Sequence, residues 1–345
     1  MDQPIARPAP ARLPSLRPDA AVATQLRAAL AGIGAYLPVN IVSNDDLSRT
    51  VDTSDEWIRT RTGIGQRHIA GPGESCAMMG ARAAQAALDD AGVAASAVDA
   101  IILATATPDQ AFPATAVRVQ AALGAGGFAF DISAACSGFI YGLAIGDALI
   151  RAGSARNVLV IGAEVYSRIM NWQDRGTCVL FGDGAGAVLL RAEQGGEGPA
   201  SGILSTHLHA QGELGDILYV DGSVGQPDKP GHLVMNGREV FRHAVTRLAE
   251  AVGEALEANR LSIDDVDWLV PHQANMRIIE AVGKRIGIAP ERVVTTVAEH
   301  ANTSAASIPL ALAAAYADGR IKRGQLVLME ALGGGLTWGS ALVRL

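Results

Sequence analysis

Residues 131–146 read Asp131-Ile-Ser-Ala-Ala-Cys136-Ser-Gly-Phe-Ile-Tyr-Gly-Leu-Ala-Ile-Gly146. The pattern predicts a strand that ends near Ile132 and a helix that runs to about Ile150, with Cys136 between them. A thiol at a helix N-terminus lies beside free N–H groups and the positive end of the helix dipole, which lower its pKa and favour the thiolate. Cys136 is therefore a candidate nucleophile, although many free cysteines are simply small buried residues.

Glycine recurs every four residues in this helix, at Gly138, Gly142 and Gly146. Residues at this spacing lie on one face of a helix, and each interior glycine destabilises a helix by about 0.5–1 kcal/mol relative to alanine. The stripe therefore predicts a central helix that packs closely between other elements. The other two cysteines, Cys76 and Cys178, lack the setting of Cys136 and are predicted to lie in the core.

The composition is typical of a globular α/β protein, because 49% of the 345 residues are hydrophobic, 18% are charged and only 4% are aromatic. The net charge of −7 argues against a nucleic-acid partner, since phosphate binding relies on clustered Lys and Arg. Three widely spaced cysteines fit a reducing compartment, so we expect a cytoplasmic protein. No apolar stretch is long enough to span a membrane, and we expect no membrane partner.

Continuous apolar runs alternate with helical segments along the chain, which predicts a parallel or mixed α/β sheet covered on both faces. The predicted buried strands lie at 100–104, 128–130 and 158–161. A helix is predicted to begin after Thr53 or Ser54, and a second one to run from Ser75 to Ala91 and end at Gly92.

The second part of the chain repeats the pattern of the first, because apolar runs at 268–270 and 326–329 resemble those at 101–103 and 158–161. Each part also closes with a predicted hairpin of small residues. The hairpins are predicted at 181–190 and 336–344, and a Gly-rich segment at 195–202 separates the two parts.

Three regions follow from this division. The N-terminal region is rich in Pro, Ala and Arg, which predicts a flexible extension, with a transit peptide as the alternative. The regions are an N-terminal extension at 1–27, a first half at 28–200 with the nucleophilic cysteine, and a second half at 201–345.

Five ordered motifs closely resemble those of the β-ketoacyl-acyl carrier protein synthase III family, which are cysteine-dependent condensing enzymes of the thiolase superfamily. The likeness runs from about residue 29 to the C-terminus. The motifs are Asp55-Glu-Trp-Ile-Arg-Thr-Arg-Thr-Gly-Ile64, Ala134-Ala-Cys136-Ser-Gly138, Pro271-His-Gln-Ala-Asn275, His300-Ala-Asn-Thr-Ser-Ala-Ala-Ser307 and Gly333-Gly-Gly-Leu-Thr-Trp-Gly-Ser340.

The resemblance implies a duplicated, five-layered αβαβα thiolase-like fold and a catalytic triad of Cys136, His272 and Asn302. Cys136 would take the acyl group from coenzyme A. His272 and Asn302 would donate hydrogen bonds to the thioester oxygen of malonyl-acyl carrier protein as carbon dioxide departs, and the N–H groups of Cys136 and Gly334 would hold the tetrahedral oxyanion. His207, His209 and His300 are predicted to be structural or exposed.

The resemblance also implies where coenzyme A binds. An indole face stacks readily on a purine, and a guanidinium group suits phosphate. A surface tryptophan with solvated arginines is the alternative. The residues matched to the coenzyme A site are Trp57, Arg61, Thr62, Arg175, Gly176 and Asn275.

The helix predicted after Asn275 has one apolar side and one basic side. The basic side carries Arg277, Lys284 and Arg285, and in the family such a patch receives the acidic carrier protein. Arg242 and Arg247 could extend the patch, and an ordinary solvated face is the alternative.

Two departures concern the site. Ala301 stands where the family usually has Gly, and Leu332 stands where many members have Phe beside the acyl pocket. Phe112 matches a residue that closes this pocket across the interface of a homodimer. We expect acetyl-CoA as the acyl donor, keep longer or branched acyl groups open, and expect neither a metal nor a permanently bound cofactor.

Three other functions compete with this interpretation. A condensing enzyme of secondary metabolism, such as a polyketide starter synthase, could use the same triad with a different donor or acceptor. A thiol hydrolase would need a base that activates water, and a catalytically inactive partner subunit would be expected to lack Cys136.

Overall fold

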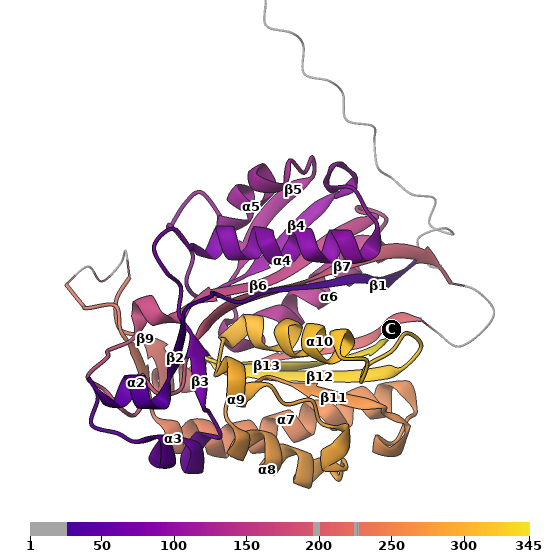
Figure 1. Cartoon of the computed structure of the whole chain (residues 1–345). Coiled ribbons are helices and arrows are strands. Elements are labelled where there is room, and N and C mark those ends of the chain that lie inside the picture. The colour runs from indigo at the N-terminus through magenta and orange to yellow at the C-terminus, as the bar shows by residue number, and fades with distance from the viewer. Residues whose placement is uncertain (1–25, 196–200, 224–225, 227) are drawn as a thin grey trace, which may run out of the picture.

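Two β-sheets form the framework of the protein in the computed structural model, which describes residues 26–195, 201–223, 226 and 228–345 (Figure 1). The first sheet has the strand order β1-β7-β6-β4-β5. Strands β6, β4 and β5 are parallel, whereas β7 is antiparallel to both of its neighbours. The strands are β1 (Leu26–Tyr36), β4 (Ala100–Ala104), β5 (Phe128–Ile132), β6 (Asn157–Val165) and β7 (Asp183–Gln194).

The second sheet has the order β11-β12-β13-β8. Here β11 and β12 are parallel, and β13 is antiparallel to both β12 and β8. The strands are β8 (Gly202–Ala210), β11 (Trp268–Pro271), β12 (Leu326–Gly333) and β13 (Thr337–Arg344).

Helices cover the outer faces of both sheets and fill the space between them, which gives five layers (Figure 1). Helices α4 (Cys76–Ala91) and α5 (Thr115–Leu123) pack on the first sheet. Helix α7 (Gly237–Asn259) packs on the second sheet beside α8 (Met276–Ile286). Helices α6 (Gly138–Arg151) and α10 (Ser307–Ala317) lie between the sheets. The αβαβα fold class predicted from the sequence is therefore confirmed.

Smaller elements complete the described chain beside the two large sheets. Two short two-stranded sheets pair β2 with β3 and β9 with β10. The remaining elements are β2 (Ile41–Ser43), α2 (Asn44–Ser48), α3 (Asp55–Thr62), β3 (Gln66–His68), β9 (Leu218–Val220), β10 (Leu233–Met235), α9 (Val297–His300) and several 3₁₀ turns.

The helix ends predicted at Ser54 and Gly92 are confirmed, whereas Ser75, predicted as the first residue of a helix, is the cap that precedes it. Ser54 caps α3 by accepting the N–H of Trp57, and Ser75 caps α4 by accepting the N–H of Met78. Helix α4 ends at Gly92, whose φ of 63° lies in the left-handed region that suits glycine. These side-chain oxygens satisfy N–H groups that have no partner inside the helix.

The glycine stripe of α6 lets this helix lie directly on the first sheet. A Cβ atom on Gly142 would lie 2.7 Å from a Val160 methyl group, and one on Gly146 would lie 2.7 Å from a methyl group of Leu190. Gly138 is equally constrained by Ala104 at 2.9 Å. The predicted close packing of a central helix is therefore confirmed.

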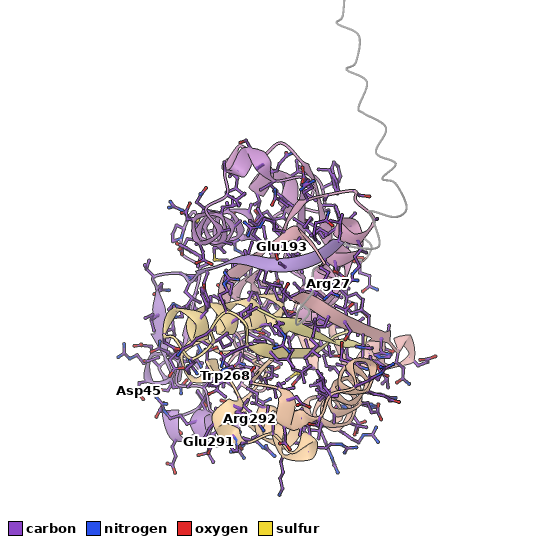
Figure 2. All side chains as sticks on the ribbon, turned by 90° about the vertical axis from the view of Figure 1, so that its right-hand side faces the viewer. Arg27, Asp45, Glu193, Trp268, Glu291 and Arg292 are labelled. Carbon is purple, nitrogen blue, oxygen red and sulfur yellow. The ribbon has the colours of Figure 1, made fainter. Side chains whose placement is uncertain are left out.

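Two sequence-based expectations need correction. The segments 181–190 and 336–344 are not hairpins in themselves, because each forms most of a single strand, β7 or β13. Each strand has small residues because it is buried between neighbours rather than because it turns. Strand β1 begins at Leu26, so Arg27 already pairs with Glu193 of β7, and the rest of the predicted extension lies outside the described residues (Figure 2).

The two sheets match strand for strand. Along β1-β7-β6-β4 the pairings are antiparallel, antiparallel and parallel, and along β8-β13-β12-β11 they follow the same sequence. A single parallel bridge between Leu269 and Val293 stands where β5 stands in the first sheet. We propose on this basis that the segments 28–200 and 201–345 are two copies of one unit.

No helix of the described residues is long and apolar enough to cross a membrane.

Glu330 of β12 is a buried carboxyl group without a complete set of partners. Its side chain is 1% exposed, and its Oε2 has no hydrogen-bond partner among the described residues. Burial raises the pKa of Glu330 to about 8. Because this pKa lies above the value in the unfolded chain, the folded state holds the proton more tightly, and Glu330 costs stability as the pH rises towards 8.

Glu330→Gln should therefore stabilise the protein in a pH-dependent way. The free energy of unfolding should match that of the wild type near about pH 4, below both pKa values, and exceed it by at least about 1 kcal/mol near pH 8. Urea unfolding at several pH values measures the difference. The exposed Glu291 provides the control Glu291→Gln. Parallel stability curves for Glu330→Gln and the wild type would contradict the raised pKa.

Candidate active site

Cys136 lies in a 3₁₀ turn, Ala135–Ser137, between β5 and the first residue of α6. Ala135 has a φ of 43°, a left-handed conformation that is uncommon for a residue with a side chain. Gly333 at the end of β12 permits this turn, since a Cβ atom there would lie 2.5 Å from the Cys136 nitrogen. The thiol is thus presented by a tight turn that the second half of the chain packs against.

His272 directly follows β11 and is fixed through both its backbone and its ring. Its N–H donates to the Glu330 carbonyl at 2.8 Å, and its Nδ1 lies 2.6 Å from the Ser307 Oγ. Ser307 Oγ also accepts the N–H of Gln273 at 3.3 Å. If the Ser307 hydroxyl donates to Nδ1, every one of these groups is satisfied, so we assign the proton of the imidazole to Nε2.

The imidazole of His272 is neutral. Only 6% of the residue is exposed, and burial lowers the pKa of His272 to about 3. A neutral ring with its proton on Nε2 is a hydrogen-bond donor and not a base. This is the protonation state that the donor role implied for His272 requires.

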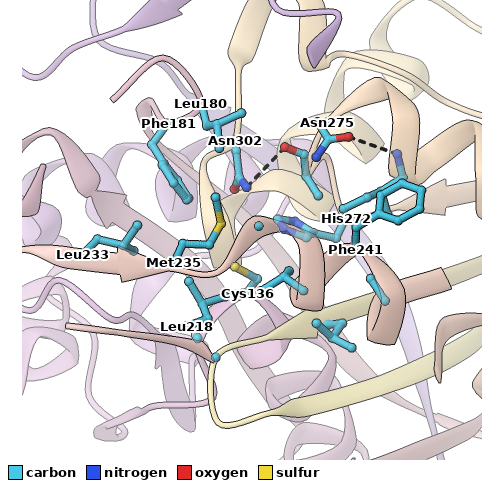
Figure 3. A pocket seen from close by; sticks show the side chains of 18 of the residues that line it. Cys136, Leu180, Phe181, Leu218, Leu233, Met235, Phe241, His272, Asn275 and Asn302 are labelled. Atoms are coloured by element: carbon cyan, nitrogen blue, oxygen red, sulfur yellow. Dashed lines mark hydrogen bonds between the residues drawn. The ribbon is translucent and has the colours of Figure 1, made fainter. Parts of the chain in front are cut away.

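Asn302 is held in place mainly by its backbone. Its N–H donates to the Leu180 carbonyl at 2.9 Å, and its own carbonyl accepts the N–H of Gly182 at 3.0 Å. Its side-chain Oδ1 accepts the N–H of Ser304 at 2.9 Å, so the Nδ2 protons remain, and one of them reaches the Ala274 carbonyl at 3.4 Å (Figure 3). Asn302 is thereby oriented as a donor.

Ala301 occupies a conformation that explains why glycine is usual at this position. Its φ is 57° and its ψ is −161°, and it is fully buried. This region of backbone space is adopted almost only by glycine, and other residues there cost of order 1–3 kcal/mol. The strain lies directly beside Asn302, and the surrounding core holds the residue in place.

Cys136, His272 and Asn302 all line one pocket of about 690 Å³. Figure 3 shows their side chains directed toward a shared space. Most of the lining residues are apolar, and three are arginines. Other lining residues include Ala106, Tyr166, Leu180, Phe181, Leu218, Leu233, Met235, Phe241, Ala244, Leu248, Ile278, Leu332, Arg61, Arg238, Asn275, Arg277 and Gly334.

Burial raises the pKa of the Cys136 thiol to about 12, which is opposite to the lowering predicted from the helix N-terminus. The prediction is wrong because the residue is only 5% exposed, and because α6 begins at Gly138 and not at the cysteine. In these surroundings the thiol of Cys136 is protonated.

Several buried polar groups behind Cys136 were not indicated by the sequence. Glu164 accepts hydrogen bonds from Thr107 Oγ1 at 2.6 Å and Thr105 Oγ1 at 3.0 Å, and burial raises its pKa to about 7. The Ser304 hydroxyl has no well-formed hydrogen bond to a described residue. It nevertheless lies close enough to Cys136 and Glu164 to oppose the burial that raises the pKa of each.

Ser307 and Tyr166 were also missed at the level of sequence. Ser307 is separated from its partner His272 by 35 residues, and only the docking of α10 against β11 brings them together. Tyr166 follows β6 and carries no motif of its own. The sequence offers one indication of a role for Ser307, because this residue is the last one of the motif at 300–307.

Trp57, Arg61 and Arg175 form a cluster near the pocket. The guanidinium groups of Arg61 and Arg175 lie 4.5 Å and 5.4 Å from the centroid of the Trp57 ring. Only Arg61 of the three reaches the pocket wall. The side chains of both arginines are exposed, which leaves them accessible to an anionic ligand.

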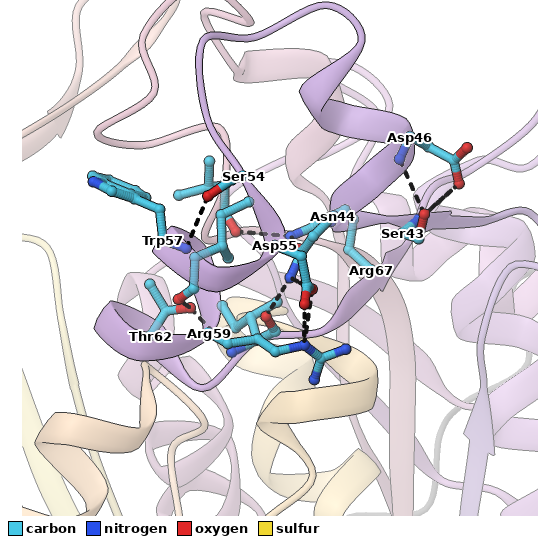
Figure 4. Close-up of polar contacts among 12 residues, drawn as sticks. Ser43, Asn44, Asp46, Ser54, Asp55, Trp57, Arg59, Thr62 and Arg67 are labelled. Carbon is cyan, nitrogen blue, oxygen red and sulfur yellow. Dashed lines mark hydrogen bonds and ion pairs between the residues drawn. The ribbon is translucent and has the colours of Figure 1, made fainter.

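Helix α3, which carries Trp57, is anchored by buried polar contacts (Figure 4). Asn44 Nδ2 donates to Asp55 Oδ1 at 2.8 Å, and Arg67 Nη2 donates to Asn44 Oδ1 at 2.8 Å. Arg59 pairs with Asp55 at 2.8 Å on the surface. These contacts hold the helix without using the Trp57 ring.

Three further residues matched to coenzyme A differ in their accessibility. Thr62 is 5% exposed, and its hydroxyl bonds to the Ile58 carbonyl and the Ile64 N–H inside the fold, so it does not face the pocket. Gly176 is exposed but lies outside the pocket wall. Asn275 lines the pocket and uses its Oδ1 to cap α8, which leaves its amide N–H groups available.

Arg277, Lys284 and Arg285 are all exposed on α8. None of the three forms an ion pair within the described part of the chain. Arg277 also lines the pocket and lies over the Phe241 ring at 5.7 Å. By contrast, Arg242 and Arg247 are paired with Glu239 and Glu250.

The two residues matched to the acyl pocket lie in different surroundings, one in the pocket wall and one on the surface. Leu332 is 5% exposed and lines the pocket beside Gly334. Phe112 is 84% exposed and does not contribute to the pocket of its own chain. Within the described residues, no cluster of His, Cys, Asp and Glu side chains could hold a metal ion.

Comparison with known proteins identifies the family. The sequence model of 3-oxoacyl-[acyl-carrier-protein] synthase III matches residues 130–212, and that of its C-terminal region matches residues 256–345. The chain is 67% identical over 319 residues to β-ketoacyl-[acyl-carrier-protein] synthase III of Acidiphilium cryptum, covering 92% of this chain and 99% of the relative. It is 66% identical to the protein of the same name from Granulibacter bethesdensis, with the same coverage.

Comparison with solved structures leads to the same family. The 3-oxoacyl-[acyl-carrier-protein] synthase III of Aquifex aeolicus superposes with a TM-score of 0.87 at 48% identity, over 92% of this chain and all of that one. The priming β-ketosynthase of the R1128 polyketide pathway gives the same TM-score at 35% identity, over 93% of this chain and 97% of that one. The chain belongs to the β-ketoacyl-acyl carrier protein synthase III family, acyltransferases that carry out the initiating condensation of fatty acid synthesis.

Proposed function

We propose that this chain condenses an acyl group from an acyl-CoA, with acetyl-CoA as the preferred donor, with malonyl-acyl carrier protein. The products are 3-oxoacyl-acyl carrier protein, carbon dioxide and free coenzyme A. The observation that carries the proposal is that a thiol and two oriented hydrogen-bond donors, His272 and Asn302, line the same pocket. A nucleophile alone would support acyl transfer, whereas the two donors support decarboxylation as well.

In the first half-reaction, Cys136 Sγ attacks the thioester carbon of the acyl-CoA. The Cys136 thiol loses its proton, the C–S bond to coenzyme A breaks, and the proton ends on the thiol of the released coenzyme A. The negative charge on the carbonyl oxygen is stabilised by the N–H groups of Cys136 and Gly334. The acyl group then remains on Cys136 while the second substrate enters.

In the second half-reaction, malonyl-acyl carrier protein binds with its thioester oxygen near His272 Nε2–H and Asn302 Nδ2–H. The bond to the carboxylate breaks, carbon dioxide leaves, and its electron pair forms an enolate that the two donors stabilise. The enolate carbon attacks the acyl-cysteine carbonyl, and collapse of the tetrahedral intermediate returns the thiolate of Cys136. That thiolate takes up a proton before the next cycle.

Trp57, Arg61 and Arg175 are the residues we assign to the nucleotide end of coenzyme A. An adenine ring can stack on the Trp57 face, and the guanidinium groups supply charge for phosphates. Asn275 at the pocket wall suits the amide groups of the pantetheine arm. Thr62 is left out of this assignment because its hydroxyl is already bonded within the fold, and Gly176 stays at the edge of the cluster.

The basic face of α8, formed by Arg277, Lys284 and Arg285, is assigned to the acyl carrier protein. The three cations are exposed and lack intramolecular ion pairs with described residues, so they can attract an acidic partner. Arg277 belongs both to this face and to the pocket wall, so the face lies next to the pocket that a carrier-bound arm has to reach.

We assign a homodimer in the cytoplasm. Strand β5 is the edge of the first sheet and has an exposed Phe128, and an unpaired apolar edge is a site for pairing with a second copy. Exposed Phe112 fits the closing of a neighbouring pocket across such an interface.

The polyketide-type alternative is not favoured, because its structural relative is 35% identical whereas the curated synthase III relatives reach 67%.

Cys136→Ser should abolish transfer of an acetyl group from acetyl-CoA to the protein. A hydroxyl is far less nucleophilic than a thiolate in this buried site. Intact-protein mass spectrometry after incubation with acetyl-CoA measures the adduct. The buried Cys178 lies outside the pocket wall, so Cys178→Ser is the matched control and should still be acetylated. An adduct on Cys136→Ser would overturn the assignment of the nucleophile.

Ser307→Ala should slow decarboxylation of malonyl-acyl carrier protein by on the order of 10-fold, because the imidazole of His272 loses the partner that fixes its proton on Nε2. Acetylation of Cys136 should change much less. Release of carbon dioxide and the acetyl adduct are measured separately. Ser340→Ala is the control, since Ser340 is also buried and bonded but lies outside the pocket wall. Equal loss in both half-reactions would show that Ser307 acts only on the fold.

Lys284→Glu should raise the KM for malonyl-acyl carrier protein several-fold, roughly 3- to 10-fold at low salt, and the effect should shrink as salt is added. The kinetics of acetyl transfer from acetyl-CoA should stay the same. Lys322→Glu makes an identical change in charge at another exposed position after α10 and should leave the KM unchanged. An equal rise in KM for both variants would point to net charge and not to a docking face.

A further inference from the structure

Glu164 of β6 is a buried carboxyl group that neither the triad nor the assigned substrate sites use. The residue is 0% exposed and lies outside the pocket wall. Burial of a carboxyl group is unfavourable unless hydrogen bonds replace the water it loses. The groups that surround Glu164 therefore show which form of the carboxyl the fold is built to hold.

All the described hydrogen bonds of Glu164 come from donors. Thr107 Oγ1 and Thr105 Oγ1 donate to its Oε2 at 2.6 Å and 3.0 Å, and the Ala106 N–H lies 3.1 Å from the same oxygen. Each hydroxyl oxygen also accepts a backbone N–H, so its own proton is left for the carboxyl. These donors favour the carboxylate and oppose burial, which raises the pKa of Glu164 to about 7. Glu164 can thus take up and release a proton near neutral pH.

Ser304 lies between Glu164 and the turn that presents the thiol. It begins a 3₁₀ turn that contacts both β6 and the nucleophile turn. Gly162 precedes Glu164 by two residues and so lies on the same face of β6. A Cβ atom on Gly162 would lie 2.2 Å from the carbonyl oxygen of Ala305. The turn that begins at Ser304 therefore packs directly on the face of β6 that carries the Glu164 side chain.

The hydroxyl of Ser304 is suited to bridge the carboxyl and the thiol. Ser304 is fully buried, and its Oγ has no hydrogen bond of good geometry to a described residue. It lies close enough to Cys136 and to Glu164 to oppose the effect of burial on the pKa of each. A hydroxyl has one proton to donate and two lone pairs that accept. Ser304 can therefore accept the thiol proton while it donates its own proton to the carboxylate.

Three other titratable groups face Glu164, namely Cys136, Tyr166 and Cys76 of α4. Burial is the main cause that raises the pKa of each of them, and a negative charge on Glu164 raises it further. All three stay protonated and neutral at physiological pH, so Glu164 is the group of this cluster that changes its charge near neutral pH. The coupling also disfavours simultaneous ionisation of the thiol and the carboxyl, which suits the exchange of one proton between them.

We propose that Ser304 and Glu164 form a proton relay for Cys136, in which Glu164 is a positioning residue that acts through the Ser304 hydroxyl. As Sγ attacks the thioester carbon, the thiol proton moves to Ser304 Oγ, and the Ser304 proton moves to the carboxylate, which becomes a carboxylic acid. As the bond to the coenzyme A sulfur breaks, the two transfers reverse and deliver the proton to the departing sulfur. The inference rests on the proposed acyl-cysteine chemistry and adds the route of the thiol proton.

The test measures the rate of Cys136 acetylation by acetyl-CoA from about pH 5.5 to 9 in the full-length wild type, Glu164→Gln and Ser304→Ala, by time-resolved intact-protein mass spectrometry. The wild-type rate should fall below about pH 7, because a protonated carboxyl cannot accept a proton. Both variants should lose this inflection and react about 100-fold more slowly at pH 8, as for the loss of a general base. The double variant should be no slower than either single variant, because the two residues act as a unit.

Decarboxylation of malonyl-acyl carrier protein is the internal control. It takes no proton from the thiol, so it should change much less than acetylation in both variants. The ratio of the two rates on one sample does not depend on how much of that sample is folded. An inflection retained in either single variant would overturn the relay. An equal loss in both half-reactions would also overturn it, because Glu164 and Ser304 would then act only on the fold.

A second probe separates the relay from the proposed function. Iodoacetamide reacts with a thiol that has lost its proton and needs no acyl-CoA site. Its rate at Cys136, located by peptide mass spectrometry, should show the inflection near about pH 7 in the wild type and lose it in Glu164→Gln. If the wild type forms no acetyl adduct, the proposed function fails. The alkylation profile then decides the relay alone, and an inflection that persists in Glu164→Gln overturns it.

Discussion

The active site depends on one constraint, which is that two helices must begin at the same place between two sheets. Helices α6 and α10 are covered by a sheet on each side, and the turns before them contact each other. Cys136 lies in one of these turns, and Asn302 lies just before the other. His272 enters from the end of β11 and is tied to the first residue of α10 through Ser307. Their common location is a result of layer packing and not of local sequence.

Burial also sets the protonation states of the site. Removing water disfavours charge, so the thiol of Cys136 is protonated and the imidazole of His272 is neutral. In such surroundings, a fixed hydrogen-bond donor stabilises developing negative charge more than it would in water. The proposed chemistry therefore relies on the direction of N–H groups rather than on charged side chains, and the charged residues of the pocket wall are Arg61, Arg238 and Arg277.

Much of the fold could be predicted from the sequence because local rules and burial agree. The helix ends at Ser54 and Gly92, the buried strand Ala100–Ala104 and the glycine stripe of α6 each have a direct local cause. The hairpin prediction at 181–190 failed because small residues mark close packing as well as turns. The pKa of Cys136 was misjudged because a helix terminus can be read from sequence, whereas the depth of burial cannot.

The parts of the site that could not be predicted depend on contacts between distant segments. Ser307 meets His272 across 35 residues, and Tyr166 meets Phe181 only after β6 and the segment before β7 come together. Thr62 matched a family position, yet its hydroxyl is used within the fold, which a motif cannot reveal. The left-handed backbone of Ala135 and Ser304 is likewise imposed by packing, since neither residue favours it.

Two glycines, Gly162 and Gly333, allow each half of the chain to pack closely against a turn of the other half. Gly162 of β6 leaves room for the backbone of Ala305, which a Cβ atom would approach to 2.2 Å, and Gly333 of β12 leaves room for the turn at Cys136. Each half thus completes a turn that belongs to the other, across more than 140 residues of sequence. Contacts of such long range carry a large loop-closure cost and slow the search for the native state. The turn that presents Cys136 should therefore be among the last parts of the chain to become ordered during folding.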